Sequence, residues 1–183
     1  MKSIRNYLFL FFSCTFVLTS SLLAETYEAA NISTLMRKQS DRMQSQHFVC
    51  NLGYSLTECR RQLAIVRRVV ARYHGEDLGN WTWVLVRSED WKPLLERLRL
   101  DPYSPAFSSL DQHATFLEEA LIEPGAMRAS ELLHDFEIPL NQLLEFAVSH
   151  EMGHAACQEA NEFIANQFAK GLQEGNHPSC GRK

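Results

Sequence analysis

The sequence lacks the features that mark a nucleic-acid-binding protein or a multi-span membrane protein. Its basic residues form no cluster longer than the pairs Arg60–Arg61 and Arg67–Arg68, which excludes a continuous footprint for a phosphate backbone. Beyond residue 24, no apolar stretch approaches the length of a membrane span. Internal repeats and low-complexity tracts are also missing. We therefore expect a globular domain with neither nucleic acid nor membrane as a partner.

Cysteine is scarce, and no C-x-x-C pair occurs among the five cysteines, which argues against a metal held by thiolates. One of them, Cys14, belongs to the N-terminal apolar run. The other four are expected to form disulfides in an oxidising compartment, and three pairings are possible. Local spacing favours a bond between the first two, which leaves the last two for a second bond. The four candidates are Cys50, Cys59, Cys157 and Cys180.

Residues 1–24 have the pattern of a secretory signal peptide. Lys2 and Arg5 precede an apolar run over residues 7–17, and small and polar residues follow up to Ala24. Serine and threonine interrupt a run that is already short for a bilayer, which favours a cleaved signal over a transmembrane anchor. We expect cleavage after Ala24 and a secreted or periplasmic mature protein.

The rest of the chain predicts a polar N-terminal segment over residues 25–46 and a single domain over residues 47–183. The segment is rich in serine and charged residues and poor in apolar ones, so we expect it to lie on the surface or stay mobile. The length of the mature chain is typical of one domain and is sufficient to bury a core.

Hydrophobic periodicity predicts helices and a strand in the first half of the domain. Ser55 and Glu58 form a capping-box pattern, and apolar residues at steps of four and three indicate a helix over residues 56–73. Residues 81–86, Trp-Thr-Trp-Val-Leu-Val, are β-branched and aromatic and predict a buried strand. Ser88 is placed to cap a further helix.

The second half of the domain predicts more strands and then helices. Residues 106–122 indicate two short strands joined near Asp111, although residues 116–122 could instead be helical. Residues 127–136 predict a short helix, and Pro139 suits the first turn of the next one. The sequence therefore predicts an α+β fold with a small sheet of about three strands packed on helices.

The strongest chemical signal is the run His-Glu-Met-Gly-His at residues 150–154, which uncharged residues flank. In a helix, His150 and His154 project from one face one turn apart, with Glu151 beside them. Two neutral imidazoles at this spacing can bind one Zn²⁺, and the carboxylate is placed to take a proton from metal-activated water. Burial of all three without a partner would be unfavourable, which favours a metal site over a metal-free helix. The bare pattern also occurs in many non-metalloproteins, so a third ligand is needed.

A third ligand requires the chain to bend after His154. In one unbroken helix Glu162 would lie about 12 Å along the axis from His154, too far to share a metal bound at roughly 2 Å. Asn161 is a suitable N-cap for a second helix, so a bend over residues 157–161 would return Glu162 to the histidines. Glu159 is the alternative third ligand.

The two segments together resemble the HExxH zinc metallopeptidases of the gluzincin type. His-Glu-x-x-His followed by Glu-x-x-Ala-Asn-x-Phe-Ala is particularly similar to the ImmA/IrrE-like (minimal zincin) metallopeptidases over roughly residues 143–172. The gap between the second histidine and the glutamate is short for those families and contains a cysteine. The resemblance implies a minimal zincin-like domain, with Glu151 as general base and Asn166 hydrogen-bonded to a ligand histidine. The zinc ligands that it implies are His150, His154 and Glu162.

These observations predict a secreted zinc-dependent metallopeptidase with one Zn²⁺ ion as cofactor and a peptide or protein as substrate. In this prediction Glu151 assists the attack of zinc-bound water on a peptide bond. We expect residues 83–86 or the segment over residues 107–116 to line the cleft and pair with an extended substrate. The alternative is an exported binding or structural protein whose zinc site is not catalytic.

Overall fold

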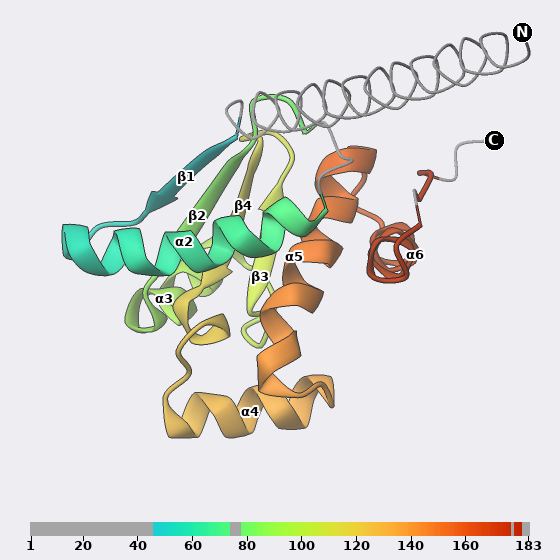
Figure 1. Ribbon diagram of the computed structural model, residues 1–183. Helices are drawn as coiled ribbons and strands as arrows, with labels where there is room; N and C mark the ends of the chain where they lie inside the picture. Colours follow the sequence, from blue (N-terminus) through green and yellow to red (C-terminus); the bar gives the residue numbers. More distant parts are fainter. Residues whose placement is uncertain (1–45, 74–77, 177, 181–183) are drawn as a thin grey trace, which may run out of the picture. The chain divides into compact units, whose positions relative to one another are not determined.

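The computed structural model describes residues 46–73, 78–176 and 178–180, which all belong to one compact unit (Figure 1). The predicted signal peptide at residues 1–24 and all but the last residue of the predicted polar segment lie outside the described residues. Within the described part of the chain, no helix combines the length and the apolar character needed to cross a membrane.

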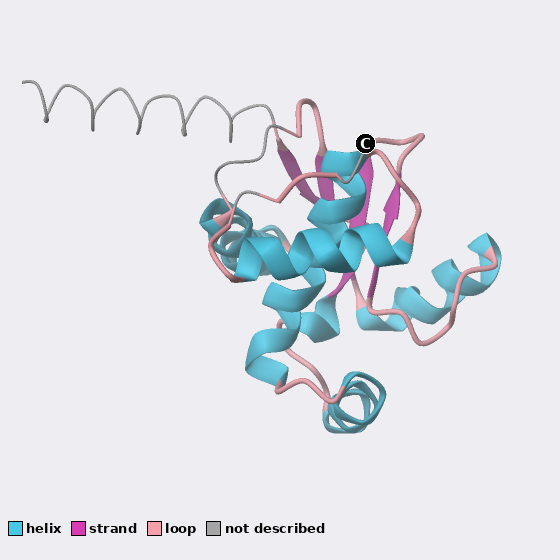
Figure 2. Ribbon diagram, turned by 90° about the vertical axis from the view of Figure 1, so that its right-hand side faces the viewer, coloured by secondary structure: helices cyan, strands magenta, loops and turns pink. Residues whose placement is uncertain are grey.

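The centre of the fold is a four-stranded mixed sheet (Figure 1). The spatial order is β1-β2-β4-β3; β1, β2 and β4 run parallel, and β3 pairs antiparallel with β4 at one edge. In the turned view the strands lie side by side behind the helices of one face (Figure 2). The strands are β1 (His47–Cys50), β2 (Thr82–Val86), β3 (Ala106–Ser109) and β4 (Ala114–Glu118).

In the part of the chain that the structure describes, five α-helices and one short 3-10 helix surround this sheet, so the expected α+β class is confirmed. Strand residues alternate between two apolar clusters, one on each face of the sheet. Trp83 and Leu85 pack into the larger cluster with α2 and α5, whereas Val86 packs with Trp91 and Leu95 of α3 on the other face. The helices are α2 (Leu56–Arg72), α3 (Ser88–Leu98), η1 (Glu119–Leu121), α4 (Ala126–Phe136), α5 (Leu140–Cys157) and α6 (Glu162–Gln173).

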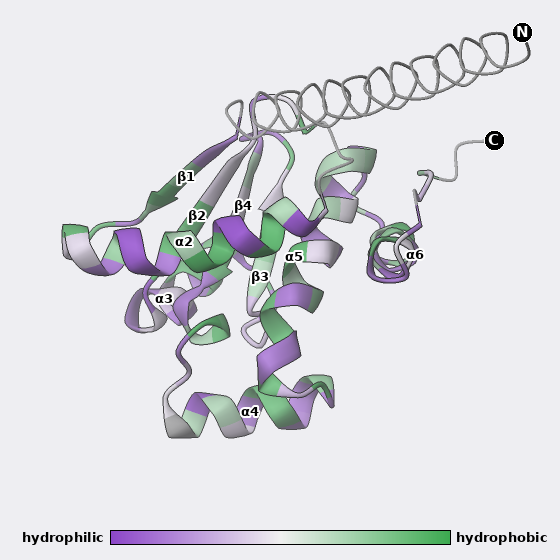
Figure 3. Cartoon of the chain, viewed as in Figure 1, coloured by the Kyte–Doolittle hydropathy of each residue, from purple (hydrophilic) through white to green (hydrophobic). Residues whose placement is uncertain are grey.

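Most of the predicted elements are present. The Ser55 hydroxyl accepts a hydrogen bond from the Glu58 backbone N–H at 3.2 Å, and hydrophilic and hydrophobic residues alternate along α2 as an amphipathic helix requires (Figure 3). The two short strands expected over residues 106–122 are β3 and β4, and η1 follows them. Ser88 was expected to cap α3, but it is the first helical residue and Arg87 holds the cap position.

The strand count is a correction, because the sequence predicted about three strands and the sheet has four. The missed strand is β1, which pairs in parallel with β2, residue His47 beside Thr82. It has only four residues, His-Phe-Val-Cys, none of them fully buried, and a segment this short carries no recognisable strand pattern in the sequence. Its strand conformation depends on hydrogen bonds to a partner more than 30 residues away, which local patterns do not reveal.

Both expected disulfides are present, in the pairing that local spacing favoured. The Cys50–Cys59 bond connects the end of β1 to the first turns of α2. The Cys157–Cys180 bond connects the last residue of α5 to the C-terminal tail. The two cross-links therefore hold the beginning and the end of the described domain against the core.

A buried ion pair attaches α4 to the sheet. The guanidinium of Arg128 donates from Nε and Nη2 to the carboxylate of Glu118, the last residue of β4, over 2.7 to 3.1 Å. Burial raises the pKa of Glu118, and the hydrogen bonds and charge of Arg128 oppose that rise. Arg128 Nη2 also donates to the Tyr103 carbonyl at 3.4 Å, which ties the loop between α3 and β3 to the same point.

Candidate metal centre and cleft

Helix α5 carries the motif residues, and the prediction that they are helical is confirmed. His150 and His154 lie one turn apart, and their Nε2 atoms are 3.2 Å from each other. Glu151 is only 4% exposed and lines the same cleft as the two histidines. The helix therefore presents two imidazole nitrogens at one point, with a buried carboxylate next to them.

The bend that a third ligand requires lies directly after α5. The helix ends at Cys157, and Gln158 follows in a left-handed conformation with φ 50° and ψ 44°, which reverses the chain. Asn161 then caps α6, because its side-chain oxygen accepts hydrogen bonds from the backbone N–H groups of Phe163 and Ile164. Helix α6 thus starts at Glu162, as the capping pattern predicted.

A close helix crossing fixes where α6 lies. A Cβ atom at Gly153 would stand 2.8 Å from both the Cα and the carbonyl oxygen of Ala165. Only glycine allows the two backbones to approach this closely, because the colliding atoms belong to the backbone of α6 and cannot rotate away. The crossing holds the first turn of α6 over the histidines of α5.

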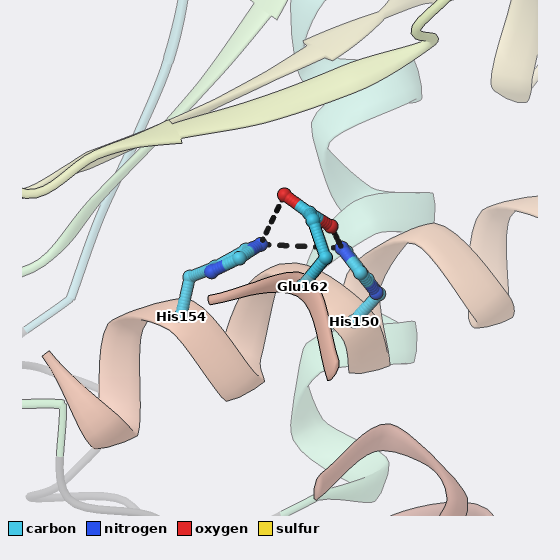
Figure 4. Close-up of side chains that lie close together, drawn as sticks. All are labelled: His150, His154 and Glu162. Carbon is cyan, nitrogen blue, oxygen red and sulfur yellow. Dashed lines mark hydrogen bonds and ion pairs between the residues drawn. The ribbon is translucent and has the colours of Figure 1, made fainter. Parts of the chain in front are cut away.

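Glu162 completes a cluster with the two histidines, which we call the His₂Glu cluster: His150, His154 and Glu162 (Figure 4). Its Oε2 lies 3.0 Å from His150 Nε2, and its Oε1 lies 3.4 Å from His154 Nε2. Ligands at about 2 Å in tetrahedral coordination are roughly 3.3 Å apart, so the observed spacings fit one metal ion.

The hydrogen bonds behind the histidines determine which ring nitrogens are free. His154 Nδ1 lies 2.7 Å from the Glu159 carbonyl oxygen, and His150 Nδ1 lies 3.0 Å from the side-chain oxygen of Asn166. Both oxygens can only accept, so Nδ1 carries the proton in each neutral imidazole, which leaves the lone pair on Nε2. Two lone pairs that face each other and a carboxylate repel one another unless a cation lies between them.

The electrostatic surroundings keep His150 neutral. Burial lowers its pKa first, and the neighbouring His154 lowers it further, whereas Glu162 acts in the opposite direction. A neutral imidazole is the form that binds a metal. The surroundings therefore favour the metal-binding form of His150 at neutral pH.

Glu151 is the buried acid of the site. Burial raises its pKa to about 7, while the polar Ser108 side chain and the charge of His154 act in the opposite direction. One of its carboxyl oxygens, Oε2, is buried and has no hydrogen-bond partner. A carboxylate in this state is suited to exchange a proton near neutral pH.

A cleft of about 260 Å³ opens beside the cluster. One wall is made by α5 and the start of α6, and the other by β3 and the loop that precedes it. Two segments were expected to line a cleft. Phe107, Ser108 and Leu110 of the segment over residues 107–116 line it, whereas residues 83–86 belong to the central strand β2 and do not.

The residues that line the cleft are Leu100, Asp101, Ser104, Ala106, Phe107, Ser108, Leu110, His150, Glu151, His154, Ala160 and Glu162.

Comparisons with known proteins add no relative. A scan against protein-family models, a search of curated proteins and a search of solved structures each find no match for this chain. The interpretation of the site therefore depends on its own geometry.

The structure brings together the residues that the sequence singled out as ligands and places Asn166 behind His150, as expected. The alternative ligand Glu159 contributes its backbone carbonyl to His154, and its exposed side chain is not part of the cluster. Sequence reasoning missed Ser108, which lines the cleft from β3 together with Glu151. Side chains alternate between the two faces of a strand, and this alternation within residues 106–109 was the only available signal. It shows which face Ser108 occupies only when the strand register is already known.

Proposed function

We propose that this protein is a zinc-dependent metallopeptidase in which His150, His154 and Glu162 hold one Zn²⁺ ion. The observation that carries the proposal is the convergence of two Nε2 lone pairs and a carboxylate within 4.8 Å of one another. Two imidazoles and one carboxylate are a ligand set of catalytic zinc sites, which keep the fourth position for water or substrate. The α+β architecture, with a small sheet packed on helices that include the motif helix, agrees with the minimal zincin-like domain that the sequence predicts.

The chemistry divides between the ion and the side chains. Bound zinc supplies Lewis acidity, which activates a water molecule and polarises a peptide carbonyl. Glu151 is the general base, because its unpartnered Oε2 and raised pKa suit it to accept a proton beside the cluster and pass it on to the leaving amine.

Strand β3 is the expected binding site for the substrate backbone. It is the antiparallel edge of the sheet, and Ala106, Phe107 and Ser108 line the cleft. An extended peptide can add to such an edge through backbone hydrogen bonds. The volume of the cleft suits one or two side chains of an extended segment.

The fourth coordination position separates this proposal from a structural zinc site. Closed structural sites use four protein ligands. Within the described ranges, the metal-binding group contains three residues and no fourth histidine, cysteine or acidic residue. The adjoining cleft supports an open site. The two disulfides support export to an oxidising compartment, and we propose a secreted or periplasmic location.

The test compares the mature wild-type protein with Glu151→Gln. Elemental analysis should find one zinc ion per chain in both proteins, and digestion of an unbiased peptide library should reveal cleavage by the wild type only. Loss of the base is expected to lower the rate by about 10²- to 10⁴-fold. Bound zinc with equal, negligible cleavage in both proteins would reject the peptidase and favour a structural site.

A second test assigns the third ligand. Glu162→Ala should weaken zinc binding far more than Glu159→Ala, because only Glu162 directs its carboxylate at the histidines. Competition with a chelator of known affinity measures both variants. The reverse order would move the ligand to Glu159.

A further inference from the structure

The C-terminal tail is attached to both helices that form the metal centre. Its Cys180 is bonded to Cys157, the last residue of α5. Pro178 packs against Gly171 in the last turn of α6, where a Cβ atom on the glycine would stand 2.8 Å from the Pro178 Cβ. We call residues 178–180 the strap, because this short segment fastens the end of α5 to the end of α6.

The turn between α5 and α6 carries part of the site. His154 lies in the last turn of α5, and its Nδ1 donates to the Glu159 carbonyl oxygen 2.7 Å away. In the opposite direction, the backbone N–H groups of Gln158 and Glu159 donate to the His154 carbonyl, the second over 3.3 Å. The orientation of the His154 ring and the position of Glu162 at the start of α6 therefore both depend on this turn.

Gln158 gives the turn an unfavourable backbone conformation. Its φ of 50° is left-handed, which glycine adopts easily and a residue with a Cβ atom does not. The last turn of a helix also frays when nothing anchors it. The disulfide is attached at Cys157, one residue before Gln158, so it anchors the chain at the point where the turn is least favourable.

The same disulfide closes a loop that contains all of α6. Its two cysteines are 23 positions apart, and Glu162 lies between them. Closure of the loop limits how far the two helices can separate before a metal binds. The Cys50–Cys59 bond differs, because it joins β1 to α2 and its loop contains no residue of the His₂Glu cluster.

We propose that the Cys157–Cys180 disulfide positions the ligands His154 and Glu162, so that the zinc site reaches its full affinity only after this bond has formed. Bond formation joins the two Sγ atoms, and the two electrons and two protons pass to a disulfide oxidant, which becomes a dithiol. Oxidants of this kind maintain disulfides in exported proteins, so the site stays weak in a reducing compartment. The proposal rests on the proposed function, in which the His₂Glu cluster holds zinc.

The test compares two double substitutions that each remove one disulfide. Cys157→Ala with Cys180→Ala should lower zinc affinity by about ten- to hundredfold, the range expected when groups that orient metal ligands are lost. Cys50→Ala with Cys59→Ala is the matched control, and it should bind zinc as the wild type does although it also lacks a cross-link. Chelator competition measures the affinities at a temperature at which circular dichroism shows all three proteins folded.

Two results of this comparison would overturn the proposal. One is a wild-type affinity in the variant without the Cys157–Cys180 bond, and the other is an equal loss in both variants, which would reflect stability alone. If the first variant does not fold, Gly171→Ala replaces it, because the added methyl group pushes the strap off α6 while both disulfides remain. Gly171→Ala should bind zinc more weakly than the wild type, and equal affinity would then overturn the proposal.

Amide hydrogen exchange tests the same bond without zinc. In the metal-free protein, loss of the Cys157–Cys180 bond should speed exchange at the N–H groups of Gln158 and Glu159 by about tenfold or more, because such turns exchange through local opening. The variant without the Cys50–Cys59 bond should exchange these amides at the wild-type rate. Unchanged exchange in both variants would overturn the role of the bond.

The two readouts also separate this proposal from the peptidase function. If the wild type binds zinc but cleaves no peptide, the peptidase function fails and the comparison of zinc affinities still decides the role of the bond. If the wild type binds no zinc, the metal centre fails, and amide exchange alone decides whether the bond holds the turn.

Discussion

Two glutamates are buried to almost the same degree in this protein, but their surroundings differ. Glu118 is 2% exposed and Glu151 is 4% exposed. The carboxylate of Glu118 accepts three hydrogen bonds from the guanidinium of Arg128, whereas Glu151 Oε2 has no partner. Burial raises the pKa of both, but an opposing cation is in contact with Glu118 only.

The comparison separates a carboxylate that serves the fold from one that is suited to chemistry. A buried charge with a complete set of partners holds two elements in register, and its removal leaves the partner uncompensated. A buried charge without partners lowers stability, and such groups concentrate at functional sites. The substitution of glutamine for each glutamate should therefore have opposite consequences.

The largest expected effect on stability comes from Glu118, the glutamate that is paired with Arg128. Glu118→Gln keeps the shape but leaves the buried guanidinium of Arg128 with only the half-buried carboxylate of Glu131, 3.0 Å from its Nη1, which should lower the free energy of unfolding by about 3 kcal/mol. Urea unfolding at pH 7 measures this free energy, and Glu159→Gln, at an exposed glutamate, is the control. A loss below 1 kcal/mol would mean that this pair does not hold α4 in place.

The same substitution at Glu151 should stabilise the metal-free protein. The folded-state pKa is raised from 4.5 to about 7, so the stability that the protonated group contributes is complete below pH 4.5 and is lost as the pH rises through 7. Glu151→Gln does not titrate, and at pH 8 it should be more stable than wild type by roughly 2 to 3 kcal/mol.

Near pH 4.5 the two metal-free proteins should be almost equally stable. Unfolding curves of chelator-treated protein at pH 4.5 and pH 8 measure the difference. Equal stabilities at both pH values would contradict the contrast between Glu151 and Glu118.

The glycine at the helix crossing should affect the site without touching a ligand. Gly153→Ala places a methyl group 2.8 Å from the backbone of Ala165, so α6 must shift and carry Glu162 away from the histidines. We expect a loss of about 1 to 3 kcal/mol in stability together with weaker zinc binding. Gly125→Ala is the control, because its Cβ would meet open space. Unchanged zinc affinity in Gly153→Ala would show that the crossing does not position Glu162.

The smallest expected effect comes from the partner of His150. Asn166→Ala removes the acceptor that fixes the Nδ1 proton and should lower zinc affinity by about tenfold, with little change in fold because Asn166 is exposed. Chelator competition measures the affinity, and Asn176→Ala, on the C-terminal tail, provides a control. An affinity equal to that of wild type would mean that the ring orientation is fixed by packing alone.

Much of the candidate site could be predicted from local sequence. The spacing of His150 and His154 needs only a helix, and the bend before Glu162 follows from the capping preference of Asn161 and the length of an unbroken helix. The favoured disulfide pairing followed from the short separation of Cys50 and Cys59. These features depend on residues close in sequence, whose relative positions secondary structure already specifies.

The opposite wall of the cleft could not be predicted in the same way. Strand β1 gave no pattern because its pairing partner is remote, and β3 lies next to α5 only after the sheet has formed. Ser108 had no signal as a neighbour of Glu151, because a register shift of one residue would turn it to the other face of the sheet.

The sequence by itself determined the helix that carries His150, Glu151 and His154, the reversal that follows it and the α+β class, because these depend on local spacing and capping. Only the tertiary structure decided that Glu151 Oε2 lacks a partner while Glu118 is paired with Arg128, and that Ser108 of β3 lines the same cleft as Glu151. Those facts depend on contacts between segments distant in the chain, which strand order and register create.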